Sequence, residues 1–509
     1  MFSRTYTGAI DGINGFLVCV EADISEGLPE FSMVGGLASE VKEAKERVRI
    51  ALKNSGYRLP PKRITVNLSP ADVRKQGTTF DLPIAISILA ASGYIPQDSL
   101  EKIIIIGELS LDGTVSRVDG ILPIIYSAYE QGFTKCIVPL ENAKESAVIK
   151  QMEIIGVSNL EETFLYLNGD KTIESTFIDV DELFNNVLDK YDIDFEDISG
   201  QESVKRAVEV AVAGNHNILI IGPPGSGKTM VAKRIPTIMP KLTFEESIEI
   251  SKVYSVSGML DNKHALMVNR PFRAPHHTIT QSALTGGGRS PKPGEISLAS
   301  GGVLFLDELP EFNKNTLEIF RQPLEDGKVS ITRVHGTYTY PANLILACAM
   351  NPCKCGYYPD RQKCNCSINE VNRYLGKISK PLLDRIDICV EAPRIEYKDL
   401  KTRRQGESSL IIRERIMRTR SIQKERYREE GIYTNSQMSN KQVEKYCILG
   451  KKEKKILEKA FNKYNLSARM YYKILKVART LADIDGREDI SELDITEAIC
   501  YRTIDKKYW

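Results

Sequence analysis

The stretch GPPGSGKT, from Gly222 to Thr229, limits what this chain can fold into more than any other feature. It follows the apolar run Ile218 to Ile221 and precedes a segment compatible with a helix. That order predicts the strand, loop and helix of a phosphate-binding loop rather than a glycine-rich turn that matches by chance. Glycines let backbone N–H groups face a phosphate, and the helix N-terminus adds partial positive charge. The expected nucleotide-binding residues are Gly222, Pro223, Pro224, Gly225, Ser226, Gly227, Lys228 and Thr229.

Roles within this loop follow from its chemistry. Lys228 is expected to reach the β- and γ-phosphates of ATP, and Thr229 to hold Mg²⁺. A second acidic signal, GGVLFLDELPEF, places Asp307 and Glu308 directly after an apolar strand predicted from Val303 to Leu306. Asp307 would bind Mg²⁺, and Glu308 would polarise the attacking water. An ordinary buried strand ending in an acidic turn is the alternative, and the preceding phosphate loop disfavours it.

Three further polar residues extend the pattern. Asn351 ends the apolar strand Leu344 to Met350, where an amide could orient water near the γ-phosphate. Arg385 lies in SKPLLDRID, and Arg469 lies in a basic helix. An arginine at a γ-phosphate stabilises transition-state charge and often comes from a neighbouring subunit. Spacing alone favours a surface salt bridge for both arginines.

Length and composition indicate a soluble protein of about three domains, with 509 residues, 42% of them hydrophobic and 27% charged. No apolar run approaches a membrane span, and the N-terminus lacks the apolar core of a signal peptide. We therefore expect a cytoplasmic protein without membrane partners. Residues 401–509 hold 26 Lys+Arg against 16 Asp+Glu. This excess suits nucleic acid or an ordinary solvated helical surface equally well.

The pattern divides the chain into four parts. Residues 1–165 alternate strands and helices and form an α/β domain. Residues 166–197 are acidic and predict a linker with one short helix. Residues 198–395 contain the nucleotide motifs in an α/β core, and residues 396–509 are helical.

Two stretches of the first part resemble the proteolytic domain of Lon-type proteases: Lys75 to Asp81 and Gly107 to Pro139. Lon uses a serine activated by a lysine. On the Lon pattern the serine position falls at Thr79 and the lysine position at Leu122. Since leucine cannot accept a proton, we expect a Lon-like fold without peptidase activity.

Four cysteines cluster in one short segment, 353–366, as two C-x-C pairs. Four thiolates in one loop suit tetrahedral Zn²⁺, and a reducing compartment argues against disulfides. The C-x-C spacing is tighter than usual, so four free thiols are the alternative. The predicted zinc ligands are Cys353, Cys355, Cys364 and Cys366.

The order of these motifs resembles an AAA+ ATPase, and nearly the whole chain is similar to the magnesium-chelatase-like family called ComM or YifB. The supporting segments are FSMVGGLASEVKEAKERVRIALKNSGY, TVNLSPADVRKQGTTFDLPIAI, RPFRAPHHT, PGEISLASGGVLFLDELPEF, RQPLEDGKVSITR and SKPLLDRID. The resemblance implies that Asn351 is the sensor-1 asparagine, Arg385 the arginine finger and Arg469 the sensor-2 arginine. It implies a Lon-like domain, a P-loop core and a helical lid. It also implies a homo-hexamer that moves along single-stranded or branched DNA and promotes branch migration in homologous recombination, as in natural transformation. Recombination proteins are its expected partners.

Basic residues between and after the nucleotide motifs are candidates for DNA contact. Gly327 to Pro341 predicts a hairpin that, by analogy with related machines, would line a central pore. Support of subunit contacts or of the nucleotide pocket is the alternative. The candidate residues are Arg270, Arg273, Lys328, Arg333 and His335.

Two functions of other classes remain open. A chelatase-type motor would remodel a protein partner, because the ATPase core resembles magnesium chelatase. An ATP-dependent protease is disfavoured by Leu122.

Overall fold

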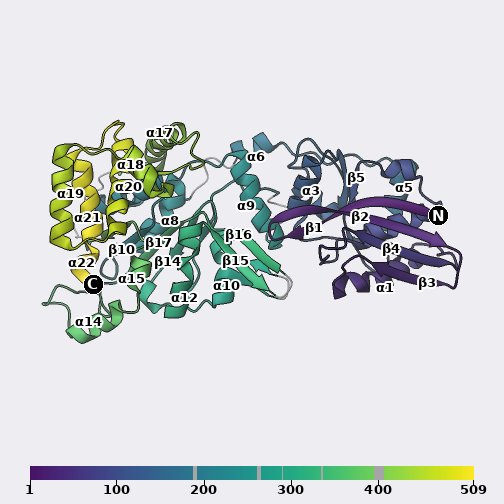
Figure 1. Ribbon diagram of the computed structural model, residues 1–509, viewed down its shortest axis with the longest axis horizontal. Helices are drawn as coiled ribbons and strands as arrows, with labels where there is room; N and C mark the ends of the chain where they lie inside the picture. Colours follow the sequence, from purple (N-terminus) through teal and green to yellow (C-terminus); the bar gives the residue numbers. More distant parts are fainter. Residues whose placement is uncertain (187–191, 261–264, 289–290, 334–335, 395–405) are drawn as a thin grey trace.

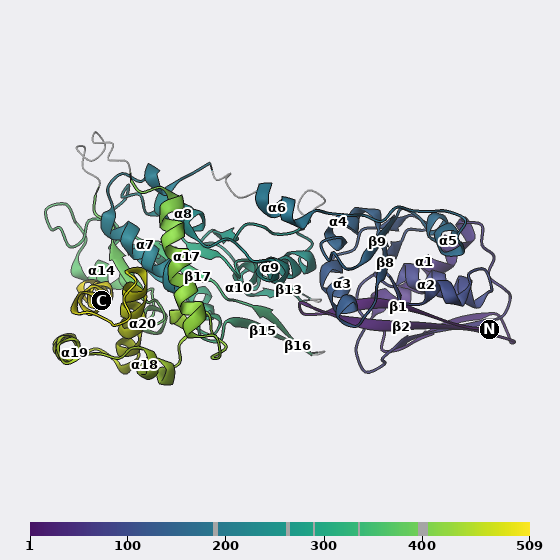
Figure 2. The ribbon, with the colours of Figure 1, turned by 90° about the horizontal axis from the view of Figure 1, so that it is seen from above.

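The chain forms an elongated molecule with two α/β parts and a helical part in sequence order from one end to the other (Figure 1; Figure 2). The computed structural model describes residues 1–186, 192–260, 265–288, 291–333, 336–394 and 406–509. No helix within these ranges is both apolar enough and long enough to cross a bilayer.

The N-terminal part is a mixed seven-stranded sheet in the order β3-β4-β2-β1-β5-β8-β9. Strands β1 and β2 form a long antiparallel pair, and β5, β8 and β9 run parallel. Helices α1 and α2 bury apolar faces against the sheet. The strands are β1 (Phe2–Asp11), β2 (Asn14–Ser25), β3 (Glu30–Val34), β4 (Arg63–Ser69), β5 (Ile103–Ile105), β8 (Lys135–Pro139) and β9 (Glu153–Val157). The helices are α1 (Ser39–Asn54), α2 (Asp81–Ala91), α3 (Ile121–Glu130), α4 (Ala143–Ser146), α5 (Leu160–Asn168) and α6 (Val180–Asn186).

The central part is a five-stranded, all-parallel sheet in the order β11-β14-β17-β10-β18. Strands β10, β14 and β17 are continuous apolar runs, as expected for strands buried on both faces of a sheet. The strands are β10 (Ile218–Ile221), β11 (Phe272–Arg273), β14 (Val303–Leu306), β17 (Ile345–Met350) and β18 (Ile388–Glu391). The helices are α7 (Glu202–Gly214), α8 (Lys228–Ile238), α9 (Phe244–Val256), α10 (Gln281–Thr285), α11 (Glu295–Leu298), α12 (Lys314–Glu318), α13 (Pro323–Asp326), α14 (Ile368–Leu375) and α15 (Lys380–Leu383). The predicted α/β fold class is confirmed.

Two small hairpins project from this core toward the N-terminal part (Figure 1; Figure 2). One pairs β12 (Gly286–Gly287) with β13 (Lys292–Pro293), and the longer one pairs β15 (Lys328–Arg333) with β16 (Gly336–Pro341). The longer hairpin has a buried apolar face with Val329 and Ile331, which fixes its register.

The C-terminal part consists of helices that pack on the central part. They are α17 (Ser409–Arg426), α18 (Asn440–Tyr446), α19 (Lys451–Tyr464), α20 (Ala468–Ile484), α21 (Glu492–Thr503) and α22 (Asp505–Tyr508). The buried carboxylate of Asp483 binds Arg426, Arg479 and Asn435, and so ties α17 to α20. Lys473 on α20 forms an ion pair with Asp387 at 2.7 Å, which joins the helices to the start of β18.

Most basic residues of α17 are held by contacts within the chain, whereas Arg418 and Lys424 are exposed. Arg413 donates to Thr237 O, and Arg420 donates to Val212 O. Arg415 pairs with Glu209 and Glu407. Because these guanidinium groups hold α17 against the core, the C-terminal charge excess overstates the basic surface that faces solvent.

Helix α9 joins the N-terminal and central parts. The cluster of apolar residues around α3 includes Ile248 of α9, and Lys252 lies 3.9 Å from the ring centre of Tyr126. Ser255 Oγ donates to the buried carboxylate of Glu145 at 2.5 Å and accepts the N–H of Leu122 at 3.3 Å. Burial raises the pKa of Glu145, and the hydrogen bonds from Ser255 and Asn142 oppose that shift.

We expect Ser255→Ala to destabilise the junction. The change removes one of two side-chain donors to Glu145, Asn142 being the other, and leaves Leu122 N–H without its acceptor, at a cost of about 1–3 kcal/mol. Differential scanning calorimetry should show a thermal midpoint lower by about a few degrees. The control is Ser257→Ala, since the half-buried Ser257 hydroxyl donates only to Val253 O on the same helix. Equal midpoints for the two variants would contradict this account.

Candidate functional site

The phosphate loop connects β10 to α8, and its backbone explains its glycines. Gly225 and Gly227 have φ of 74° and 82°, a left-handed conformation that side chains disfavour. A Cβ on Gly222 would lie 2.4 Å from Ala392 O. The loop ends at Lys228, the first residue of the 11-residue helix α8, so the positive end of that helix faces the loop.

Lys228 lies at the centre of the site. Its Nζ donates to Gly222 O at 2.8 Å, to Pro223 O at 2.9 Å and to Asn351 Oδ1 at 3.1 Å. Burial lowers the pKa of Lys228, while the charges of Asp307 and Glu308 oppose the shift. The structure therefore brings together the lysine and the strand-terminal asparagine that the sequence placed 123 residues apart.

Oxygen ligands suited to Mg²⁺ meet beside the lysine. Thr229 Oγ1 donates to Asp307 Oδ2 at 2.7 Å, which places a hydroxyl from the first turn of α8 beside a carboxylate at the end of β14. A hydroxyl and a carboxylate are donors that Mg²⁺ accepts in nucleotide sites, so the residues present fit this ion. Glu308 is exposed beside them, with a left-handed φ of 50°. Its N–H donates to Asp307 Oδ1 at 2.9 Å, and strained backbone of this kind clusters at functional sites.

Arg385 and Arg469 are also brought together, on a shared carboxylate. Glu325 Oε2 lies 2.5 Å from Arg385 Nη2, and Glu325 Oε1 lies 3.3 Å from Arg469 Nη2. Arg385 also donates to Arg321 O and Pro381 O and is only 12% exposed, whereas Arg469 is 41% exposed. Burial raises the pKa of Glu325, but the two arginines outweigh it and the net shift is downward.

Glu325 is a residue that the sequence reasoning missed. It lies in RQPLEDGKVSITR, at the end of the four-residue helix α13. No sequence signal distinguishes Glu325 from its neighbour Asp326, because both partners of Glu325 lie at least 60 residues away in the chain.

The basic residues proposed for DNA contact fall into two groups. Arg270 donates to Pro240 O and Gly301 O and pairs with Glu246, and Arg273 pairs with Glu295 at 2.6 Å. Both arginines are therefore held by contacts within the chain. Lys328 and Arg333 are exposed on β15, and Arg333 Nε donates to Gly288 O, which joins the two hairpins. His335 lies outside the described residues.

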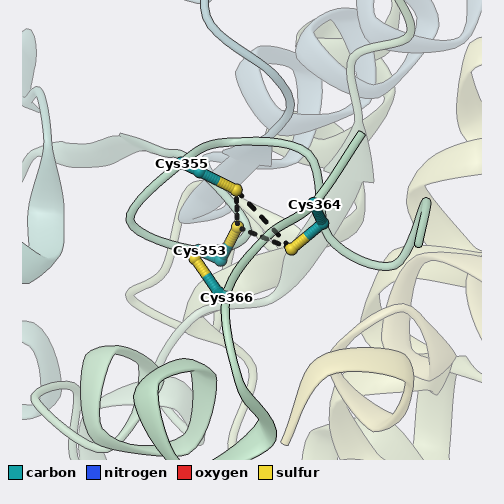
Figure 3. Close-up of side chains that lie close together, drawn as sticks. All are labelled: Cys353, Cys355, Cys364 and Cys366. Carbon is teal, nitrogen blue, oxygen red and sulfur yellow. Dashed lines mark hydrogen bonds between the residues drawn. The ribbon is translucent and has the colours of Figure 1, made fainter. Parts of the chain in front are cut away.

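The four clustered cysteines converge at one point (Figure 3). All four sulfur atoms lie within 4.8 Å of one another. The separations are 3.3 Å from Cys353 to Cys355, 3.5 Å from Cys355 to Cys364 and 3.8 Å from Cys353 to Cys364. Thiolates arranged tetrahedrally at the usual Zn–S distance would be about 3.8 Å apart. The cluster can therefore bind zinc.

The Lon-like dyad positions show no catalytic pair. Thr79 is buried, and its Oγ1 lies 3.5 Å from Gly8 O. Leu122 is fully buried at the start of α3, with its N–H bound to Ser255 of α9.

Comparison with known proteins agrees with this geometry. The family model "Magnesium chelatase, subunit ChlI" matches residues 194–400, "Subunit ChlI of Mg-chelatase" matches residues 20–142, and "Magnesium chelatase, subunit ChlI C-terminal" matches residues 406–502. The chain is 42% identical to competence protein ComM of Haemophilus influenzae over 98% of this chain and 97% of that protein. It is 39% identical to the uncharacterized protein YifB of Escherichia coli over 99% of this chain and 97% of that protein. A weaker similarity, 30% identity over 26% of each chain, links it to Lon protease 2 of Bacillus subtilis. The chain therefore belongs to the ComM/YifB family of magnesium-chelatase-like AAA+ proteins.

Proposed function

We propose that this protein is an ATP-driven DNA translocase that promotes branch migration in homologous recombination, as in natural transformation. The observation that carries the ATPase part is the bonded set of Lys228, Thr229, Asp307 and Asn351 at one edge of a parallel sheet. The competence protein among the relatives supports the DNA part.

Each residue of the set has a proposed task in hydrolysis. Lys228 and the loop N–H groups hold the phosphates, and Thr229 with Asp307 holds Mg²⁺. Mg²⁺ supplies charge neutralisation at the phosphates. Glu308 polarises the attacking water, and Asn351 orients it. When ATP binds, Lys228 exchanges the carbonyls of Gly222 and Pro223 for phosphate oxygens, which are stronger acceptors.

Arg385 and Arg469 are proposed to act on ATP held by a neighbouring protomer of a homo-hexamer. Their shared partner, Glu325, holds both guanidinium groups in one place. The Asp387–Lys473 ion pair fixes the segment after Arg385 to the helix that carries Arg469. The two arginines therefore move together, as one unit facing a subunit boundary would require.

DNA is proposed to contact the joined hairpins. Exposed Lys328 and Arg333 lie on β15, and the Arg333–Gly288 contact aligns both hairpins. Cationic groups on a projecting hairpin suit the phosphates of single-stranded or branched DNA. Arg270 and Arg273 are proposed to support this region through their ion pairs. Recombination proteins are the expected partners.

A chelatase-type motor that remodels a protein partner is the second candidate, and the three chelatase family matches favour it. It would hydrolyse ATP with the same residues, but its rate would respond to protein and not to DNA. A protease is disfavoured, because Leu122 cannot activate Thr79.

The cysteine cluster is proposed to hold one structural Zn²⁺. Its four sulfur donors leave no position open for a substrate, which is typical of structural rather than catalytic zinc.

The central prediction concerns DNA-stimulated hydrolysis. The ATPase rate, measured without DNA and with single-stranded, duplex and branched DNA, should rise most with branched DNA. The ATPase rate of the Lys228→Ala variant should be lower by more than about a hundredfold, because the variant lacks the charge-assisted contacts of the lysine to phosphate. Lys233→Ala, an exposed lysine on the same helix, is the matched control. Hydrolysis that ignores DNA but depends on Lys228 would favour the protein-remodelling motor.

A mixing experiment tests the contribution across the subunit boundary. Arg385→Ala and Lys228→Ala protomers, each inactive alone, should regain hydrolysis when mixed, because some boundaries then combine an intact loop with an intact arginine. Random assembly in a symmetric ring limits recovery to about a quarter of the boundaries. Arg385→Ala mixed with the double variant is the control and should regain nothing. A monomeric preparation with full activity would contradict this proposal.

Charge reversal on the hairpin tests the DNA contact. Arg333→Glu should weaken DNA binding by a similar factor for all sequences, because phosphate contacts carry no sequence information. Fluorescence anisotropy at several salt concentrations should show a salt slope smaller by about one. Lys451→Glu reverses an exposed charge on α19, at the far end of the molecule, and should leave binding unchanged. Equal affinities for Arg333→Glu and Lys451→Glu would exclude this contact.

A further inference from the structure

The cysteine segment packs directly against the phosphate loop. Asn351, which accepts the Lys228 hydrogen bond, is only two residues before Cys353. Gly356 has a left-handed φ of 88°, and a Cβ there would lie 2.3 Å from Pro224 Cδ in the phosphate loop. The segment therefore meets the nucleotide site at two points, through Asn351 with Lys228 and through Gly356 with Pro224.

Turns and side-chain packing shape this segment, and no regular secondary structure does. Between the end of β17 at Met350 and the start of α14 at Ile368, the structure contains no helix or strand. Cys353 and Cys364 are buried, and the N–H of Tyr358 points at Cys353 Sγ at 3.4 Å. A long irregular segment gains order mainly from a cross-link that closes it, and four converging thiols are the cross-linking groups present.

We propose that a metal ion in the cysteine cluster holds the phosphate loop in its nucleotide-binding form, so that metal occupancy sets the affinity for ATP. This proposal rests on the nucleotide and zinc sites proposed above. The metal holds the cysteine segment in place. The segment then holds Pro224 through its contact with Gly356, and it positions Asn351, which bonds Lys228. Gly356 is a positioning residue, because it permits the close approach and touches no phosphate itself.

Loss of the metal should change the affinity for ATP and leave the rate of ATP cleavage unchanged. Loss of the cross-link frees Pro224 and Asn351, so the free loop samples arrangements that do not bind phosphate. Asp307 and Glu308 lie on a separate strand end and keep their places. Bound ATP selects the arrangement in which Asn351 orients water, so at saturating ATP the cleavage step should proceed at its ordinary rate.

The test uses the full-length chain and two independent readouts. Zinc per chain is measured by elemental analysis, and the Kd for a fluorescent, non-hydrolysable ATP analogue is measured with Mg²⁺ and without DNA. Cys364→Ser should lose zinc and weaken analogue binding by about tenfold or more. Cys500→Ser, an exposed cysteine on α21 outside the cluster, should change neither.

Gly356→Ala separates the contact from the metal itself. We expect it to keep its zinc, because the ligands are untouched, yet to weaken analogue binding as the new Cβ displaces Pro224. Its KM for ATP should rise, while kcat at saturating ATP stays within about twofold of the unaltered protein. Retained zinc also shows that the segment has not unfolded, which Cys364→Ser alone cannot show.

Reversible metal removal completes the test. Protein stripped with a chelator, dialysed and returned to Mg²⁺ should bind the analogue weakly and recover when Zn²⁺ is restored. If the stripped protein or the Gly356→Ala variant bound the ATP analogue with unaltered affinity, the proposed coupling would be wrong. If the unaltered protein contained no zinc when purified, the proposed metal would be wrong. If Lys228→Ala bound the analogue as tightly as the unaltered chain, the ATP site itself would be wrong.

Discussion

The pairing of β10 with β17 is the constraint on which the rest of the site depends. The two strands run parallel in register from Ile218 opposite Ala347 to Ile221 opposite Met350, so they end at the same level. The phosphate loop follows one strand and Asn351 follows the other, and Lys228 bridges them. Strand β14 pairs with the far side of β17 and brings Asp307 to the same edge. One slip in this register would separate the lysine from its partner and the threonine hydroxyl from the carboxylate.

Most of this edge could be predicted from the sequence, because each part is local. An apolar run of four residues followed by GPPGSGKT specifies a strand and a loop without reference to the remaining chain. The same holds for the run that ends at Asp307. Once three such strands are placed in one parallel sheet, their polar ends must meet at one edge. The positions of β10 and β14 were therefore predicted to the residue, and β17 began one residue later than expected.

The partners of the charged side chains could not be predicted, since they lie far apart in the chain. Arg270 and Arg273 find Glu246 and Glu295 more than twenty residues away, and Arg415 finds Glu209 across 206 positions. A basic sequence pattern gives the sign of a segment's net charge but not the direction in which its side chains point. The contact between Gly356 and Pro224 could not be predicted either, because these residues also lie far apart in the chain. A turn within the cysteine-rich loop would explain the glycine equally well.

The hydrogen bonds of Arg385 limit how it can act. In this structure it donates to two backbone carbonyls and to Glu325, so the proposed action on a neighbour's phosphate would require it to exchange at least the carboxylate. A triphosphate with Mg²⁺ still carries more negative charge than one carboxylate, and Coulomb attraction favours the exchange wherever the two surfaces exclude water. Glu325 would then keep Arg469 as its partner and could bind Arg385 again when the phosphate leaves. On the proposed assembly, Arg385 would contact the neighbour only when ATP is bound there, so the subunit boundary would be tighter with ATP than without it.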